Sequence, residues 1–189
     1  RYTRFWGAIH DVLASGRLGT VINVDHRENV AYWHMAHSFV RGNWGISAAS
    51  SPMILAKCCH DMDILYWFIG APVRRLSSFG RLSHFRPQNA PKGAPLRCTD
   101  GCPAQEECPF YAPRQYLREG TDWPINVISL DLSFEGRMKA LREGPYGRCV
   151  YHCDNDVVDN QVVNMEFEND VTLTFTMQWH DCAVLAASS

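Results

Sequence analysis

The strongest constraint on the fold is a strict alternation of apolar and polar residues near the C-terminal end of the chain. Every second position between 171 and 179 is apolar, in the order Val171, Leu173, Phe175, Met177 and Trp179. Alternating residues lie on opposite faces of a β-strand, so this pattern predicts a strand that is buried on one side only. A second strand is predicted over 161–168, and Asn169-Asp170 between the two predicts the tight turn of a β-hairpin.

Other patterns predict helices and further strands around this hairpin. Apolar residues at helical spacing predict helices over 4–14 and 53–69, and shorter helices are predicted over 109–118 and 138–142. Strands are predicted over 20–30, 73–85 and 148–152. On the first of these strands one face is shared by Ile22, Val24, His26, Glu28 and Val30.

Together these elements predict an α+β fold, with a largely antiparallel open sheet and helices on one face, chiefly the helix 53–69. We expect a single domain, 1–189, whose two ends are cut from a longer chain. The chain opens on a helical pattern without an initiator Met, and it ends soon after a strand. Pro, Gly and Cys are frequent between residues 86 and 123, which predicts an irregular insertion within the domain.

The composition excludes several classes of protein. The 189 residues include 18 Lys and Arg against 20 Asp and Glu, a net charge of −2, so the basic excess typical of nucleic-acid-binding proteins is missing. No apolar run approaches the ~20 residues of a membrane-spanning helix, and the first residues do not resemble a signal peptide. We therefore expect a cytoplasmic protein whose partners include neither nucleic acid nor membrane.

The predicted helix 53–69 carries ionisable residues inside an otherwise apolar segment. Lys57, His60 and Asp63 follow one another at a spacing of three, so they share one side of the helix. A histidine beside a lysine and a carboxylate suits proton transfer to or from a hydroxyl group, which makes these three the candidate catalytic residues. In the alternative interpretation Lys57 and Asp61 form a solvated i,i+4 pair and His60 is a core residue.

The segment 32–44 is dense in aromatic and polar residues without clear periodicity, which indicates a loop. Such a loop suits a polyhydroxylated or anionic small molecule, because aromatic faces pack on the apolar face of a ring while Arg and Asn donate forked hydrogen bonds. The candidate substrate-binding residues are His34, His37, Arg41, Asn43 and Trp44. Two alternatives are a loop packed only by its aromatic side chains and a zinc hydrolase site that begins with the two histidines of His34-x-x-His37.

Three cysteines of the insertion, Cys98, Cys102 and Cys108, lie within eleven positions of one another. Their spacing predicts a structural zinc site, or an iron–sulfur cluster, with Cys149, Cys153 or His152 as the fourth ligand. The set Cys98, Cys102, Cys108 and Cys149 is our candidate metal site. Free thiols and disulfides are the alternatives.

Four stretches of the chain resemble one family of enzymes. They are the His60-x-x-Asp63-x-x-x-Trp67 pattern and the segments 15–21, 37–44 and 154–163. In their order along the chain, these stretches resemble the C-terminal domain of the Gfo/Idh/MocA oxidoreductases, the relatives of glucose–fructose oxidoreductase and inositol dehydrogenase. The resemblance implies an open sheet like that of dihydrodipicolinate reductase. The tail from Asp181 departs from the family, in which a further hairpin follows.

The resemblance also implies a function. Members of the family are two-domain enzymes in which an N-terminal Rossmann domain binds NAD or NADP, and this domain presents a sugar, a polyol or a related hydroxy compound. By position His60 is the acid/base and Asp63 supports it. Members with inositol-type activity have an Asp four residues before this His, where this chain has Ala56, so that Lys57 is the nearest ionisable group.

Two further expectations follow from the resemblance. No GxGxxG motif follows a predicted strand, so we expect no cofactor-binding residue in this chain and no activity of the chain alone. The open, Thr-rich face of the sheet is expected to pack against a second subunit in a homo-oligomer. The alternative function is a non-catalytic, metal-stapled module that binds a ligand or takes part in assembly.

Overall fold

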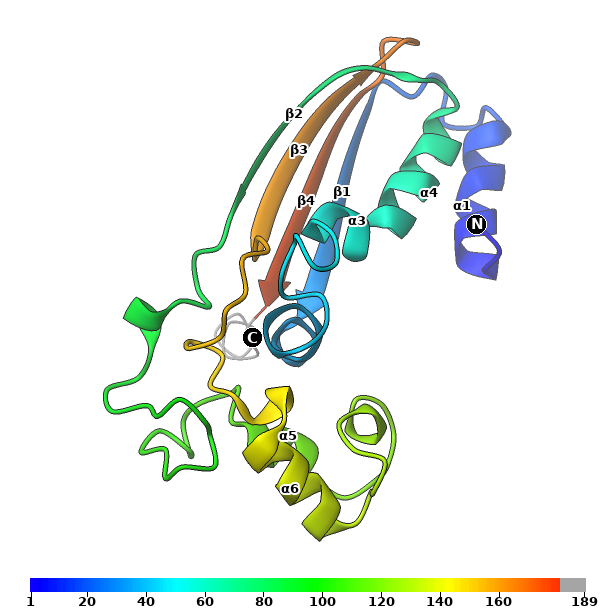
Figure 1. Ribbon diagram of the computed structural model, residues 1–189. Coiled ribbons are helices and arrows are strands. Elements are labelled where there is room, and N and C mark those ends of the chain that lie inside the picture. Colours follow the sequence, from blue (N-terminus) through cyan, green and yellow to red (C-terminus); the bar gives the residue numbers. More distant parts are fainter. Residues whose placement is uncertain (181–189) are drawn as a thin grey trace.

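A computed structural model describes residues 1–180 and shows a four-stranded sheet in the order β1-β4-β3-β2 (Figure 1). The strands are β1 (Asn23–Ala31), β2 (Val73–Arg81), β3 (Asn160–Phe167) and β4 (Thr172–His180). β3 is antiparallel to both β2 and β4, but β1 is parallel to β4. The α+β class is therefore confirmed, whereas the sheet is mixed rather than largely antiparallel. β4 of the hairpin lies between β3 and β1. The helical segment after β1 crosses the sheet and leads to β2 at the opposite edge, which is the kind of crossover connection that strands of the same direction require.

The predicted C-terminal hairpin is confirmed. Phe167 donates its backbone N–H to the carbonyl of Val171 at 2.9 Å, and Asp170 in the turn adopts a positive φ of 65°. Every apolar residue from Val171 to Met177 is buried, and Phe175 is fully enclosed opposite Val163 of β3. The alternation in the sequence therefore sets which face of the sheet packs against the rest of the protein.

The first strand shows the predicted division into two faces from Val24 onward, but Ile22, predicted on the inward face, precedes the strand and is exposed. Val24, His26, Glu28 and Val30 are each less exposed than the residues that alternate with them. Two of these inward-facing side chains, His26 and Glu28, are polar and lie in the middle of the strand. Polar groups on a covered face need partners, and the helices above supply them.

The predicted helix 53–69 is divided into α3 (Met53–Ala56) and α4 (Cys59–Ile69). Lys57 and Cys58 lie between them, with φ values of −112° and −97°. The second half ends as predicted, at Gly70, which has a φ of 68° and donates its N–H to the carbonyl of Tyr66. Because the helix is interrupted, the side chain of Lys57 is no longer fixed at the i,i+4 spacing that would pair it with Asp61.

The segment 32–44, which was predicted as a loop, is largely helical. It begins with α2 (Tyr32–His34) and continues as a π-helix, η1 (Met35–Arg41). π-helices are rare, occur frequently at functional sites and have i→i+5 hydrogen bonds, so an α-helical periodicity does not detect them. Gly42 ends the run because a Cβ atom there would lie 2.5 Å from the carbonyl oxygen of His37.

The remaining helices are α1 (Arg4–Ala14), α5 (Ala112–Tyr116) and α6 (Phe134–Glu143). Short 3-10 turns occur at Pro87–Asn89, Ile125–Val127 and Pro145–Gly147. The strand predicted over 148–152 is wrong, since its only ladder contact within residues 1–180 is an isolated bridge between Arg148 and Arg97. The predicted insertion forms the part of the molecule that carries α5, next to α6 (Figure 1).

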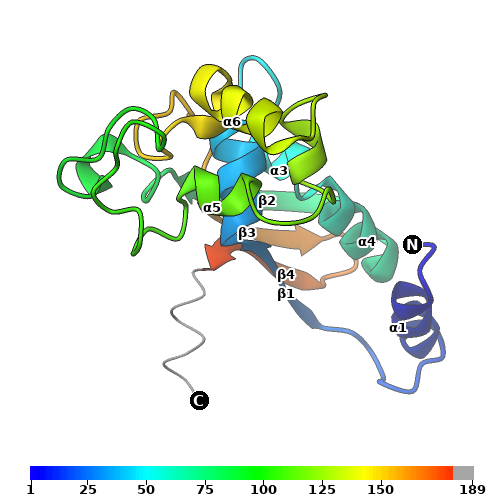
Figure 2. The same ribbon diagram turned by 90° about the horizontal axis from the view of Figure 1, so that it is seen from below.

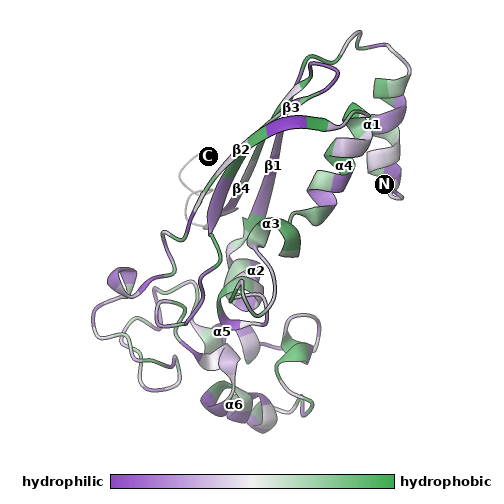
Figure 3. Ribbon diagram, turned by 45° about the horizontal axis from the view of Figure 1, so that its top comes forward, coloured by the Kyte–Doolittle hydropathy of each residue, from purple (hydrophilic) through white to green (hydrophobic). Residues whose placement is uncertain are grey.

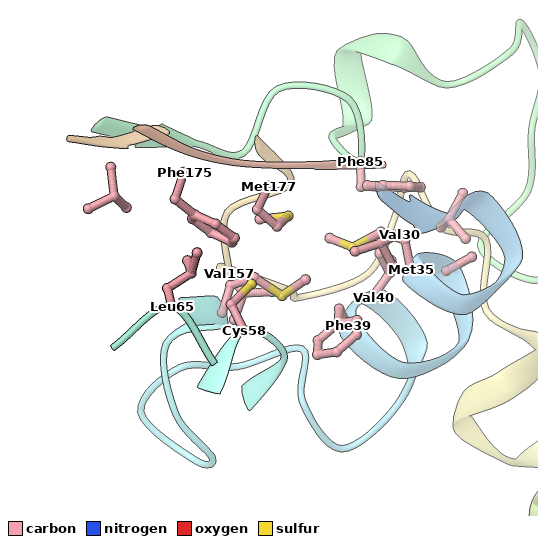
Figure 4. Packing of buried hydrophobic residues seen from close by; sticks show 14 of the residues in the cluster. Val30, Met35, Phe39, Val40, Cys58, Leu65, Phe85, Val157, Phe175 and Met177 are labelled. Atoms are coloured by element: carbon pink, nitrogen blue, oxygen red, sulfur yellow. The ribbon is translucent and has the colours of Figure 1, made fainter. Parts of the chain in front are cut away.

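Helices lie over one face of the sheet (Figure 2), and the main core lies between them and the strands. Figure 4 shows Phe175 and Met177 of β4 packed near Cys58, Leu65 and Met35 of the helical layer. A second, smaller cluster of Cys98, Ala112, Tyr116 and Leu141 joins the insertion to α6. In the hydropathy view α3 is strongly hydrophobic and α6 is mostly hydrophilic (Figure 3).

The opposite face of the sheet is mostly polar, with exposed Phe79 and Val162 on the neighbouring strands β2 and β3. The expectation that this face joins a second subunit stays a prediction. The predicted departure from the family at Asp181 lies outside the described residues. Within residues 1–180 no helix is long and apolar enough to cross a membrane.

Candidate active site

A cavity of about 500 Å³ lies where the π-helix, the α3–α4 junction and the insertion meet. Its wall contains four basic side chains, those of His34, His37, Lys57 and His60. Asn43, Trp44 and Trp123 also line it. Six of these seven residues belong to the predicted catalytic and substrate-binding sets, so segments that are apart in the sequence form one site.

His60 is exposed and lies on the wall of the cavity. It is the second residue of α4, directly after the break in the helix. The alternative in which this ring is a core residue is therefore wrong. An accessible imidazole at the edge of a cavity is placed to exchange a proton with a ligand that enters.

Lys57 also lines the cavity, and its ammonium group donates to the carboxylate of Glu28 on β1. Both side chains are about three-quarters covered, with relative exposures of 22% and 25%. The solvated Lys57–Asp61 pair is therefore wrong, because the break in the helix turns Lys57 toward the sheet. Glu28 fixes the ammonium group at the floor of the site, where it can still donate to a bound oxygen.

Asp61 is buried and accepts a hydrogen bond from Nε2 of His26 at 2.8 Å, or forms an ion pair with it when His26 is protonated. The ring of His26 stacks on Phe175 at 5.8 Å between centroids. This second polar contact between β1 and α4 fixes the helix that carries His60.

Asp63 follows His60 by one turn of α4, but its side chain pairs with the N-terminal residue of the chain. Its carboxylate accepts two hydrogen bonds from the guanidinium of Arg1, at 2.8 and 2.5 Å, which lower the pKa of Asp63. Asp63 does not line the cavity. The structure thus brings His60 and Lys57 together as predicted and leaves Asp63 outside the site.

The pKa values of His34 at the end of α2 and His37 of the π-helix are both lowered, which favours the neutral form of each ring. Burial lowers the pKa of His37 to about 4, and the neighbouring His34 and Arg41 add to the effect. Burial and then Lys57 lower the pKa of His34. Nδ1 of His37 forms a hydrogen bond of 2.9 Å with the hydroxyl group of Tyr116. Neutral imidazoles both donate and accept, so these two suit the binding of hydroxyl groups.

Arg41 does not belong to the cavity, contrary to its prediction as a substrate-binding residue. It is 2% exposed, and its guanidinium donates to the carbonyls of Arg148 and Phe110 at 2.7 and 2.6 Å. A third contact reaches the sulfur of Cys98 at 3.6 Å. Arg41 therefore binds the π-helix to the insertion and to the segment around Arg148.

Cys98, Cys102, Cys108 and Cys149 surround a closed cavity of only about 10 Å³, together with Arg41. The cysteines of the described part are free thiols, and burial raises the pKa of Cys149 to about 11. Among residues 1–180 no group of three or more His, Cys, Asp or Glu side chains is arranged to hold a metal ion. The predicted zinc site is not supported, and neither is the His34-x-x-His37 zinc site.

Sequence reasoning missed several residues of the site. His26 and Glu28 anchor α4 and Lys57, and their place on the inward face of a strand was the signal that could have identified them. Trp123 and Tyr146 line the cavity from irregular segments, where no periodicity marks which side chains point inward.

The sequence matches the model of the GFO/IDH/MocA C-terminal domain over residues 6–183. The chain belongs to this family. Its similarity to the protein named "Putative oxidoreductase YteT" of Bacillus subtilis (strain 168) is 27% identity over 184 residues, which cover 94% of this chain and 41% of that protein.

The family assignment agrees with the fold. The structure of scyllo-inositol dehydrogenase from Lactobacillus casei, with bound NAD(H) and scyllo-inositol, is similar with a TM-score of 0.50 and 13% identity. The similar region covers 96% of this chain and 34% of that one. The chain thus spans less than half the length of either of these two proteins.

Proposed function

We propose that this chain is the substrate-binding part of an NAD- or NADP-dependent dehydrogenase that oxidises a hydroxyl group of a sugar, a polyol or a related compound, or catalyses the reverse reduction. The observation that carries the proposal is an accessible imidazole, His60, beside the ammonium group of Lys57 in one cavity. The family assignment and the inositol dehydrogenase with a similar fold support an oxidoreductase of this kind.

In this proposal His60 removes the proton from the substrate hydroxyl group during oxidation and returns it during reduction. Lys57, held by Glu28, donates a hydrogen bond to the same oxygen and stabilises the negative charge that develops on it. The neutral His34 and His37 bind further hydroxyl groups of the substrate. Trp44 and Trp123 offer apolar faces to its ring.

The nicotinamide, when bound, supplies the acceptor or donor of the hydride. No residue of this chain is assigned to it, because the sequence has no Gly-rich motif between a strand and a helix to hold a dinucleotide phosphate. The two similar proteins are much longer than this chain, and the proposal therefore places the dinucleotide on a separate segment.

The test uses the full-length gene product. We expect it to bind NAD or NADP in a fluorescence titration and to reduce it with at least one sugar or polyol of a panel. His60→Asn should lower kcat by about 10²–10⁴-fold, the usual contribution of general acid–base catalysis, and should leave cofactor binding intact. His10→Asn is the matched control, because this ring stacks on Trp67 at 4.0 Å outside the cavity. Absence of cofactor binding, or equal kcat values for the two variants, would contradict the proposal.

A further inference from the structure

A second cavity, of about 430 Å³, lies beside the first one. Its wall includes Tyr32 and Trp33 of α2, Gln115 of α5, and Trp123. Trp123 lines both cavities, and its indole contacts Trp33, His34 and His37 at centroid distances between 5.1 and 5.4 Å. One aromatic side chain therefore forms a wall common to the acid–base site and to the second cavity.

The second cavity has the chemistry of a sugar-binding site. Three aromatic side chains provide apolar surfaces, and the amide of Gln115 and two arginines provide polar groups. The guanidinium of Arg118 is paired with Asp122 at 3.1 Å, and that of Arg114 donates to the carbonyls of Cys108 and Glu106 at 3.1 and 2.9 Å. These contacts hold both arginines in place, and each guanidinium carries five N–H donors in all.

His60 and Lys57 do not line this second space, and the carboxylate that does, Asp122, is paired with Arg118. Most of its wall comes from the insertion, including Arg114, Gln115 and Trp123. A binding surface that adjoins a reaction site but lacks its chemistry serves to hold a part of the substrate that does not react.

We propose that the second cavity binds a second sugar ring, so that the substrate is a disaccharide or a longer glycoside rather than a free monosaccharide. This inference rests on the proposed function. The reacting ring lies beside His60 and Lys57, and the glycosidic bond passes Trp123. The second ring packs against Trp33 and Tyr32 and is hydrogen-bonded by Gln115.

The test measures affinity by calorimetry on the full-length protein with glucose, galactose, mannose and glucuronic acid, and with disaccharides that contain each of them. We expect at least one disaccharide to bind about tenfold more tightly than its free reacting sugar, which corresponds to about 1.4 kcal/mol of binding free energy. Trp33→Leu should abolish this advantage and leave the affinity for the monosaccharide unchanged. Gln115→Ala should reduce the advantage about threefold without removing the contact of Trp33 with Trp123.

Phe134→Ala is the control, because Phe134 is an exposed aromatic residue on α6 that lines neither cavity. The inference is overturned if no disaccharide binds, if disaccharides and monosaccharides bind equally, or if both variants retain the full advantage. Turnover of monosaccharides with no preference for disaccharides would overturn only the second ring site. Tight disaccharide binding without any NAD- or NADP-linked turnover would support the second ring site and refute the proposed dehydrogenase.

Discussion

Two cations of this protein, Lys57 and Arg41, were both selected as candidate site residues from the sequence but have opposite environments in the structure. Lys57 lines an open cavity and is paired with the carboxylate of Glu28. Arg41 is enclosed, donates to two carbonyls and a sulfur, and has no carboxylate partner within the described residues. The first is positioned to act on a ligand, whereas the second connects segments of the chain.

The comparison shows what determines whether an ionisable side chain is functional or structural. A guanidinium has five donors in a rigid fork, so backbone carbonyls can satisfy it inside the protein. An ammonium group on a flexible stem can keep one partner and still offer donors to a ligand. The experiments below test this difference, and the largest expected effect comes first.

Arg41→Met should destabilise the protein by about 4 kcal/mol. The substitution leaves the buried carbonyls of Arg148 and Phe110 without a donor, and each lost partner costs about 1–3 kcal/mol, to which imperfect packing adds. Urea unfolding followed by circular dichroism measures the change. A loss below about 1 kcal/mol would mean that Arg41 is not the connection that its contacts indicate.

Lowering the pH should destabilise the protein through His37, by somewhat less than the substitution Arg41→Met does. The pKa of His37 is about 4 in the folded protein against 6.5 for an unperturbed histidine, so between these pH values the unfolded chain binds a proton that the folded protein does not. The contribution of the neutral ring is fully present above pH 6.5 and is lost as the pH falls toward 4, by about 3 kcal/mol in total. Unfolding free energies at pH 7 and pH 4.5 measure it.

His37→Gln serves as the comparison for this pH dependence, because the amide does not titrate. The loss of stability between pH 7 and pH 4.5 should be smaller in the variant than in the unmodified protein. Equal losses in the two proteins would show that the ring is not held neutral by its burial.

Lys57→Met should have the smallest effect on stability, about 1 kcal/mol or less, because the pair that it breaks is partly exposed to water. In the full-length enzyme the same substitution should lower kcat/KM about tenfold to hundredfold, the value of a hydrogen bond from a charged group. Arg41→Met and Lys57→Met thus distinguish a cation that stabilises the fold from one that acts on a ligand. A loss of stability as large as that of Arg41→Met would contradict the distinction.

The sequence predicted the fold and the site unequally. The hairpin, the bounds of α1 and the inward face of β1 follow from local periodicity, and the structure agrees with them. The parallel pairing of β1 with β4 depends on a crossover between segments more than a hundred residues apart, which no local pattern encodes. The π-helix and the break at Lys57 were missed because both depart from the regular α-helical period.

The site shows the same division. His60, Lys57, His34 and Asn43 could be selected by residue type, and they do line one cavity. Residue type could not show that Arg41 and the cysteines lie apart from it, or that Asp63 is bound by Arg1. Such outcomes depend on the partners that each side chain meets in the folded protein, which residue type does not specify.

The position of Arg41 has a consequence for how substrate preference could change during evolution. The insertion contributes Trp123, Arg114 and Gln115 to the second cavity, and Arg41 binds the insertion from within the protein. If the proposed function holds, surface residues of that segment can be replaced, and the preferred ligand can change, without altering His60 on α4. Loss of the internal contacts of Arg41 would instead displace the walls of both cavities, so this arginine should tolerate replacement less well than Arg114 or Gln115.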